Sequence, residues 1–153
     1  MNIIEKHWDS VYSTKSEQEL GWYEKDSIQI FRLLDLIPSF RKTKIFIAGA
    51  GRTVLINELL NHDVDITVND ISSEALHQIK ISITQHPPNL SYFLHDLSTP
   101  IKNITEKSDI WIDRAVLHFM IKEKSINTYF DNILSVLKPN GYIILVEFSQ
   151  EGA

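Results

Sequence analysis

The chain has 153 residues, a formal net charge of −5, a hydrophobic share of 43% and no cysteine, which predicts one ordinary globular domain. The lack of cysteine excludes disulfide bonds, thiolate catalysis and zinc–cysteine sites, and without a cluster of lysine and arginine we expect no nucleic-acid partner. The N-terminal residues lack a signal-peptide pattern and no apolar run is as long as a membrane span, so we expect a cytoplasmic protein without a membrane partner.

Helices and strands alternate in the first half of the chain. Residues 1–25 are polar but contain five aromatic or imidazole rings, more than we expect in a mobile tail. Apolar spacing and capping residues then predict the following elements. They are a helix from Ser27 to about Ile37, a strand at 44–48, a helix at about 52–61, a strand at 64–69, and a helix at about 73–84 with Ser72 or Ser73 as its N-cap.

The second half continues the alternation. It contains strands at 90–94, 108–112 and 142–148, a helix-like stretch at 114–137 interrupted near 122–125, and a turn at 138–141. Alternating strands and helices predict an α/β fold, a Rossmann-like, doubly wound parallel sheet in three αβα layers. No linker or repeat divides the chain, so we expect one domain over 1–153, with its core at 26–153.

The segment KIFIAGAG, residues 44–51, passes from an apolar strand into a loop of small residues, and the next apolar strand ends at Asp70. Gly49 and Gly51 let the backbone approach a ligand closely, and a carboxylate at Asp70 can accept hydrogen bonds from ribose hydroxyls. The layout therefore predicts a site for a nucleotide-type cofactor.

Three cofactor classes compete for this loop. A phosphate-binding P-loop is excluded because the pattern G-x-x-x-x-G-K-[ST] is absent. A dinucleotide, and with it a nicotinamide-dependent enzyme, is disfavoured because Val54 occupies the third glycine position of G-x-G-x-x-G. S-adenosyl-L-methionine has no pyrophosphate and tolerates a looser loop.

The chain resembles the class I S-adenosylmethionine-dependent methyltransferases in four segments. These are KIFIAGAGRT, VNDIS, HDL at 95–97 and LKPNGYIILVEF. Three further segments, HWDSVY…GWYEKD, NDISSEAL and IDRAVLHF, are similar to a subgroup of small methyltransferases that includes thiopurine-methyltransferase-like and citrate-synthase-lysine-methyltransferase-like proteins. The resemblance implies methyl transfer from S-adenosyl-L-methionine to a small molecule or a protein side chain, with S-adenosyl-L-homocysteine as product.

The resemblance also implies which residues bind the cofactor. Gly49, Ala50 and Gly51 would contact the methionine moiety. Asp70 would hold the ribose hydroxyls with Ile71 against the adenine, and Asp96 would accept from the adenine amino group with Leu97 beside the ring. The residues alone leave simpler interpretations open, because Asp70 could cap the next helix and Asp96 could form a turn.

Residues 1–25 would form a flap, in which Trp8, Tyr12 and Trp22 close over cofactor and acceptor. Aromatic faces attract a sulfonium cation, although the same rings could simply cover the edge of the sheet. Asp113 follows the fourth strand at the edge where open α/β sheets bind ligands, so it is the candidate catalytic residue. The alternative for Asp113 is a local pair with Arg114 or a helix cap.

Two features depart from the family pattern. Ile47 replaces the acid that usually ends the first strand, which removes a charge-assisted bond of about 1.5–3 kcal/mol. The usual C-terminal strand hairpin is absent, so the fifth strand would present an apolar edge. We expect a homodimer through this edge, unless the chain is a fragment of a longer protein. The alternative function is a catalytically degenerate fold that serves as a binding module, and the negative net charge favours a small or basic acceptor.

Overall fold

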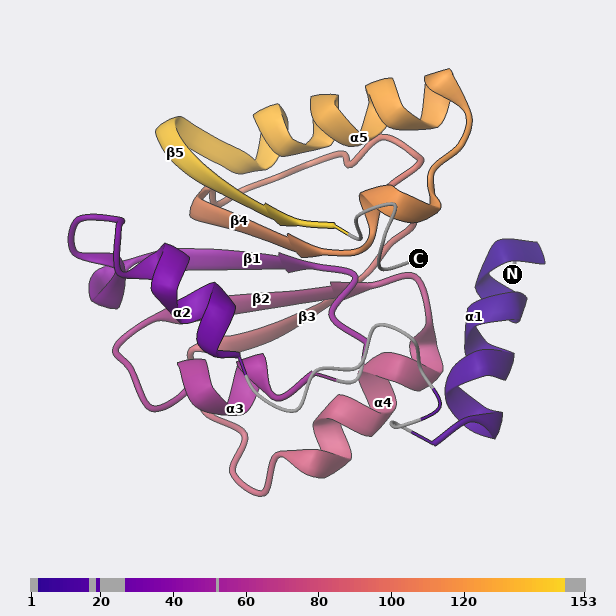
Figure 1. Cartoon of the computed structure of the whole chain (residues 1–153), viewed down its shortest axis with the longest axis horizontal. Helices are drawn as coiled ribbons and strands as arrows, with labels where there is room; N and C mark the ends of the chain where they lie inside the picture. Colours follow the sequence, from indigo (N-terminus) through magenta and orange to yellow (C-terminus); the bar gives the residue numbers. More distant parts are fainter. Residues whose placement is uncertain (1–2, 17–18, 20–26, 52, 148–153) are drawn as a thin grey trace.

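The computed structural model describes residues 3–16, 19, 27–51 and 53–147, and its centre is a sheet of five parallel strands. The strand order is β3-β2-β1-β4-β5. The strands are β1 (Lys44–Ala48), β2 (Asp65–Asp70), β3 (Leu90–Leu94), β4 (Ser108–Arg114) and β5 (Leu137–Val146). Their carboxyl ends meet at one edge of the sheet (Figure 1). The predicted doubly wound parallel sheet is confirmed.

Helices cover both faces of this sheet. One face carries α2 (Ile28–Leu34), α3 (Leu55–Leu59) and α4 (Ser73–Ser82), and the other carries α5 (Glu123–Val136) (Figure 1). Side chains on β4 alternate between the two faces of the sheet. Ile110 and Ile112 are buried on the face covered by α2, α3 and α4, and Trp111 is buried on the face covered by α5. The inner strands are apolar on both sides because both faces are covered.

The helix boundaries follow local capping and turn chemistry. Ser72 caps α4 as predicted, since its hydroxyl accepts a hydrogen bond from the Ala75 amide at 3.1 Å. Ser27 precedes α2, but its buried hydroxyl makes no cap bond. α2 ends at Leu34 and continues as turns ahead of Pro38, so it is shorter than predicted. α3 is also shorter than the predicted helix.

The segment at 114–137 divides into two helices. A short 3-10 helix, η3 (Leu117–Phe119), is followed by α5, so the predicted interruption is present. A further 3-10 helix, η2 (Phe40–Lys42), precedes β1. The first residues form a helix, α1 (Ile3–Thr14), which stands beside α4 at the carboxyl ends of the strands (Figure 1).

The turn predicted at 138–141 is wrong, because these residues form an irregularity inside β5. Leu137 pairs with Ser108 and Tyr142 pairs with Ile110, so the register shifts between these two pairs. Asn140 takes a φ of 63° within the shift. Such an insertion keeps a strand continuous while it locally unpairs and bends it, as in a β-bulge.

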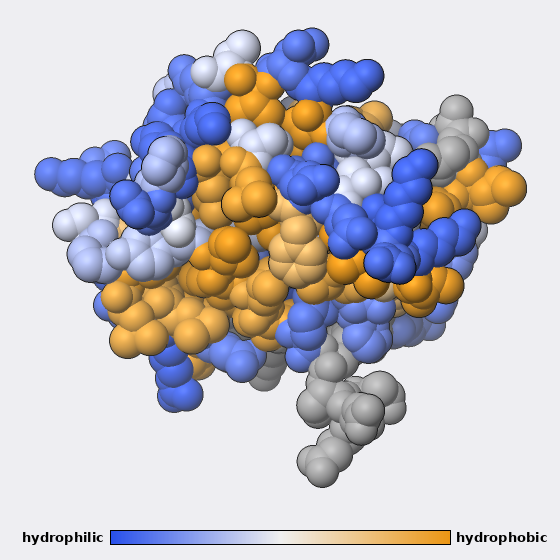
Figure 2. All heavy atoms as spheres, turned by 90° about the horizontal axis from the view of Figure 1, so that it is seen from above, coloured by the Kyte–Doolittle hydropathy of each residue, from blue (hydrophilic) through white to orange (hydrophobic). Residues whose placement is uncertain are grey.

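The edge formed by β5 exposes apolar side chains. Tyr142 is 45% exposed, Ile143 46% and Leu145 39%, and the neighbouring α5 exposes Phe130 and Leu134. Figure 2 views the molecule from the side of α5 and shows apolar surface gathered there. Within the described residues, no helix has the length and apolar character needed to cross a bilayer.

Candidate cofactor and acceptor site

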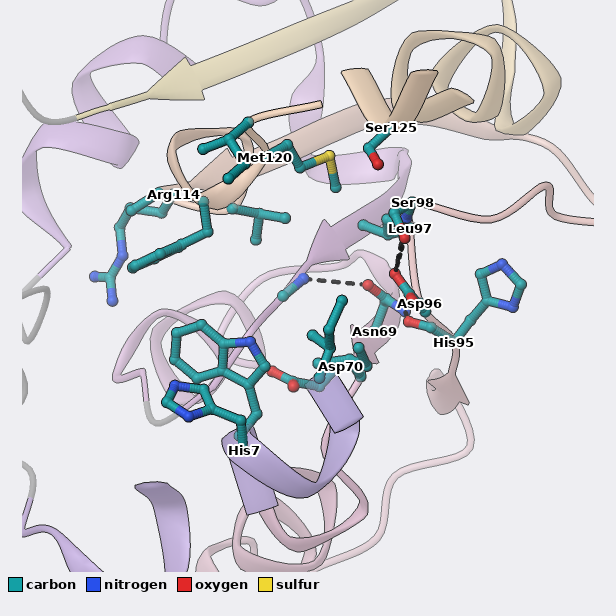
Figure 3. Close-up of a pocket in the computed structure, with 18 of the residues that line it drawn as sticks. His7, Asn69, Asp70, His95, Asp96, Leu97, Ser98, Arg114, Met120 and Ser125 are labelled. Carbon is teal, nitrogen blue, oxygen red and sulfur yellow. Dashed lines mark hydrogen bonds between the residues drawn. The ribbon is translucent and has the colours of Figure 1, made fainter. Parts of the chain in front are cut away.

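A pocket of about 550 Å³ lies where the strands end, at the place where open α/β sheets bind ligands. Its lining comes from the ends of four strands, from α1, from residues 119–122 and from Ser125. Figure 3 shows His95 and Asp96 on one side of the pocket and Arg114 on the other. The volume falls within the range of small-ligand sites, about 300–1,000 Å³.

Asp70 is buried at the end of β2 and lines the pocket. One of its oxygens accepts from the Gly51 amide at 2.8 Å and the other from the Ser72 amide at 2.9 Å. Burial raises the pKa of Asp70 to about 6, against the lowering effect of these amides, and the charge of Asp9 raises it further. Asp70 therefore links the glycine loop to the start of α4 while part of the residue faces the pocket.

The glycine loop requires residues without a side chain at two positions. Gly49 and Gly51 have φ values of 52° and 51°, in the left-handed region. A Cβ atom on Gly49 would lie 2.0 Å from Val116 Cγ2, and one on Gly51 would lie 2.3 Å from the Tyr12 hydroxyl. Gly49 lines the pocket, whereas Ala50 and Gly51 are outside the lining formed by the described residues.

Asn69 was missed by sequence reasoning although it directly precedes the candidate acid. Its side-chain oxygen accepts from the Gly49 amide at 3.2 Å, and its NH₂ group donates to the carbonyls of Phe93 and His95, both at 3.0 Å. It thus ties the loop after β1 to the residues after β3. The sequence did offer a signal, the asparagine of VND directly before the aspartate, because asparagine side chains often form hydrogen bonds with nearby backbone groups.

The residues after β3 form a compact turn on the pocket wall. Asp96 accepts from the amide and hydroxyl of Ser98, at 2.9 and 2.7 Å, and Leu97 is buried. His95 stacks on Phe93 with ring centroids 5.3 Å apart and also lines the pocket. The turn predicted for Asp96 is present, and it leaves the residue in the lining together with Leu97 and Ser98.

α1 contributes Trp8 and Tyr12 to the lining. The helix is held to the start of α4, because Asp9 accepts from the Ser72 hydroxyl at 2.5 Å and from the Glu74 amide at 3.2 Å. Trp8 contacts Phe119 edge-on, with ring centroids 5.0 Å apart. The pocket is therefore bordered by one ring from α1 and one from η3. Trp22, the third predicted flap residue, lies outside the described residues.

Asp113 is buried and lies outside the described lining of the pocket. Its carboxylate accepts from the Tyr129 hydroxyl and from the amides of Val116 and Leu117, at 2.7 and 3.1 Å. Burial raises its pKa. These bonds hold the turn after β4, in which Ala115 takes a left-handed φ of 72°. The observed contacts are those of a turn cap, which was the alternative interpretation of this residue.

The turn held by Asp113 presents its neighbours to the pocket. Arg114, Ala115 and Val116 all line it, and Arg114 was not singled out from the sequence. Ile47 is 3% exposed in the core, paired with Val68 and Ile112, so it contributes no polar group to the site. No group of three or more potential metal ligands gathers in the described part of the chain.

The pocket therefore combines two carboxylates at the ends of adjacent strands, a glycine loop and aromatic rings. Asp70 on β2 and Asp96 after β3 line the same cavity, and a carboxylate at such a strand end can accept hydrogen bonds from ribose hydroxyls. Trp8 lines the same cavity, and the faces of aromatic rings attract cations. These residues fit an adenosyl group with a positively charged sulfur.

Comparison with known proteins identifies related domains. A family model described as a methyltransferase domain matches residues 45–141. No curated protein matches the chain significantly.

Solved structures resemble the chain at low identity. The DhpI–SAM–HEP complex matches with 14% identity and a TM-score of 0.71 over 95% of this chain and 64% of that one. The glycopeptide N-methyltransferase MtfA complexed with S-adenosyl-L-methionine matches with 12% identity and a TM-score of 0.64, over 76% and 52%. A TehB-like SAM-dependent methyltransferase from Corynebacterium glutamicum matches with 20% identity and a TM-score of 0.60, over 92% and 68%. The chain thus spans about half to two thirds of the length of these proteins, and the likeness shows a shared fold.

Proposed function

The chain belongs to the methyltransferase domain family, and on that premise we propose that it transfers a methyl group from S-adenosyl-L-methionine to a small molecule or a protein side chain. The observation that carries the proposal is the pocket in which Asp70 ends β2 and Asp96 follows the adjacent β3, beside a glycine loop. Two of the matched structures are complexes with S-adenosyl-L-methionine. When bound, this cofactor supplies a methyl group on a sulfonium and leaves as S-adenosyl-L-homocysteine.

The chain's own residues would bind and orient the reactants. Asp70 accepts from the ribose hydroxyls, since three backbone amides occupy only part of its lone pairs. Asp96 accepts from the adenine amino group, and Ile71 and Leu97 pack beside the ring. Trp8 and Tyr12 cover the reactants from α1 and exclude water, which favours a reaction that depends on alignment.

Binding of the cofactor is the first test. We would titrate the protein with S-adenosyl-L-homocysteine by calorimetry, with NAD as the control ligand. We expect S-adenosyl-L-homocysteine to bind with micromolar affinity and NAD not to bind. The Asp70→Ala variant should bind S-adenosyl-L-homocysteine at least tenfold more weakly. Asp65→Ala is the matched control, because Asp65 is exposed at the other end of the same strand. Wild-type protein that binds NAD but not S-adenosyl-L-homocysteine would contradict the proposal.

A second function is favoured by one observation. Ile47 stands in the core where the family usually has an acid, so the fold could bind a ligand or partner without transferring a methyl group. Turnover separates the two functions. Release of S-adenosyl-L-homocysteine from S-adenosyl-L-methionine in the presence of candidate acceptors supports the enzyme, whereas saturable binding without turnover across the panel supports the binding module.

We also propose that a second copy of the chain covers β5. A twofold axis sets the same edge of two copies against each other, so that the exposed Ile143 and Leu145 meet their own counterparts. Light scattering at micromolar concentration should then give the mass of a dimer. Ile143→Lys should give a monomer, and a wild-type monomer at the same concentration would contradict the proposal.

A further inference from the structure

Helix α1 forms one wall of the pocket but stands outside the two main cores. Its apolar side chains pack on α4 in a small separate cluster made of Trp8, Val11, Tyr12 and Ala75. All of α1 lies within the described chain, and Tyr12 is the one residue of the helix that is buried. A segment with few buried contacts opens at a low cost in free energy, and a helix of this length is marginal by itself. The position of α1 over the pocket therefore depends on a small number of contacts with its neighbours.

Asp9 holds α1 to the first turn of α4. One of its oxygens accepts from the Ser72 hydroxyl at 2.5 Å and from the Glu74 amide at 3.2 Å. Hydrogen bonds to a carboxylate are stronger than those between neutral groups, and the positive end of the helix dipole adds to them. Further along α4, the Gln78 side chain donates to the Tyr12 carbonyl at 2.9 Å. The start of α4 is thus capped a second time, by a carboxylate from another helix.

Asp9 and Tyr12 also contact the residues that hold Asp70. The Ser72 amide donates to one oxygen of Asp70 and the Gly51 amide to the other. Asp9 binds the hydroxyl of this same Ser72. The Tyr12 hydroxyl lies against Gly51, 2.3 Å from the position that a Cβ atom would take. Two backbone donors of the candidate ribose acid are therefore each in contact with α1.

We propose that Asp9 is a positioning residue that holds α1 over the pocket and couples this closed position to Asp70 through Ser72. The inference rests on the proposed function, in which Asp70 binds the ribose of the cofactor. A cofactor bound to Asp70 stabilises the two amides beside it, and these favour the closed position of α1. Such coupling is reciprocal, so α1 in its closed position strengthens cofactor binding. Asp9 is outside the described lining of the pocket and acts through its neighbours.

Hydrogen exchange in the free protein tests whether Asp9 holds α1. The exchange of amides in residues 3–14 is followed by mass spectrometry in wild type, Asp9→Ala and Asp9→Asn. We expect exchange at least fivefold faster in Asp9→Ala, and an intermediate rate in Asp9→Asn, which keeps an acceptor oxygen but not the charge. Exchange in β1 and β4 should not change. Lys6→Ala is the matched control, because Lys6 is exposed on the same helix and is outside the described lining.

Cofactor binding tests the coupling. S-adenosyl-L-homocysteine should slow the exchange of residues 3–14 in the wild type at least fivefold. Its dissociation from Asp9→Ala, measured by surface plasmon resonance, should be at least fivefold faster than from wild type, and Lys6→Ala should behave as wild type. A role of Asp9 in overall stability alone would leave this rate unchanged under conditions in which both proteins are fully folded.

Three results would overturn the proposal. The first is unchanged exchange of residues 3–14 in Asp9→Ala, and the second is an equal acceleration in β1 and β4, which would make Asp9 a group of general stability. The third is normal binding of S-adenosyl-L-homocysteine with an unchanged dissociation rate in Asp9→Ala, which leaves the proposed function standing. If the wild type does not bind S-adenosyl-L-homocysteine, the proposed function fails and the coupling fails with it. Exchange in the free protein then decides whether Asp9 holds α1.

Discussion

The carboxyl ends of β2 and β4 each carry a buried aspartate with a raised pKa, but the two residues face different surroundings. Asp70 is the last residue of β2 and lines the pocket. Asp113 is one residue from the end of β4, and its side chain turns to Tyr129 on α5. Because side chains alternate along a strand, a shift of one residue decides which of two similar acids faces the ligand. At β4 that position belongs to Arg114.

Removal of Asp113 should have the largest effect on stability. Asp113→Ala leaves the hydroxyl of Tyr129 and the amides of Val116 and Leu117 without their acceptor, so we expect a loss of about 4 kcal/mol in the free energy of unfolding. Urea denaturation measures it. Tyr129→Phe is the graded control, with a smaller loss because it removes one of the three donors. A stable Asp113→Ala protein that binds cofactor but transfers no methyl group would instead assign Asp113 to the chemistry.

Gly49 lies between the ends of β2 and β4. Its amide donates a hydrogen bond to the Asn69 side chain, and Val116 fills the space beside it. Gly49→Ala should cost about 2 kcal/mol of unfolding free energy, from the left-handed φ and the contact with Val116 Cγ2. The double variant with Val116→Ala should recover part of this loss, because only Val116 Cβ then remains, at 3.4 Å. If Val116→Ala gives no recovery, the backbone conformation alone causes the loss.

The raised pKa of Asp70 should appear as a pH dependence of stability. Below about pH 4 Asp70 is protonated in both the folded and the unfolded protein. Between the ordinary pKa of 3.8 and the folded pKa of about 6, the unfolded chain has lost this proton while the folded protein still holds it. The free energy of unfolding therefore falls as the pH rises through this range. The slope due to one group is at most about 1.4 kcal/mol per pH unit. Denaturation midpoints of wild type and Asp70→Asn between pH 4 and 7 should differ in this slope, and parallel profiles would show that Asp70 does not titrate there.

The parallel sheet, the αβα layers and the glycine loop with its acid followed from the sequence because they rest on local periodicity and on motifs of adjacent residues. The helix α1 did not, although Trp8 and Tyr12 stand four residues apart, as on one helix face. Its position depends on the bond from Ser72 to Asp9, across 63 positions of the chain. Arg114 was missed for a similar reason, since only the register with β1 shows which residue of Asp113-Arg114 lies level with Gly49.

The turn after β4 has a consequence for how this domain can change. Asp113 binds the backbone amides of Val116 and Leu117, and every residue except proline has such an amide. Substitution of the side chains in this turn therefore leaves its anchoring bonds in place. Evolution, or an engineer, can vary the pocket lining at Arg114 and Val116 while the backbone frame is inherited unchanged.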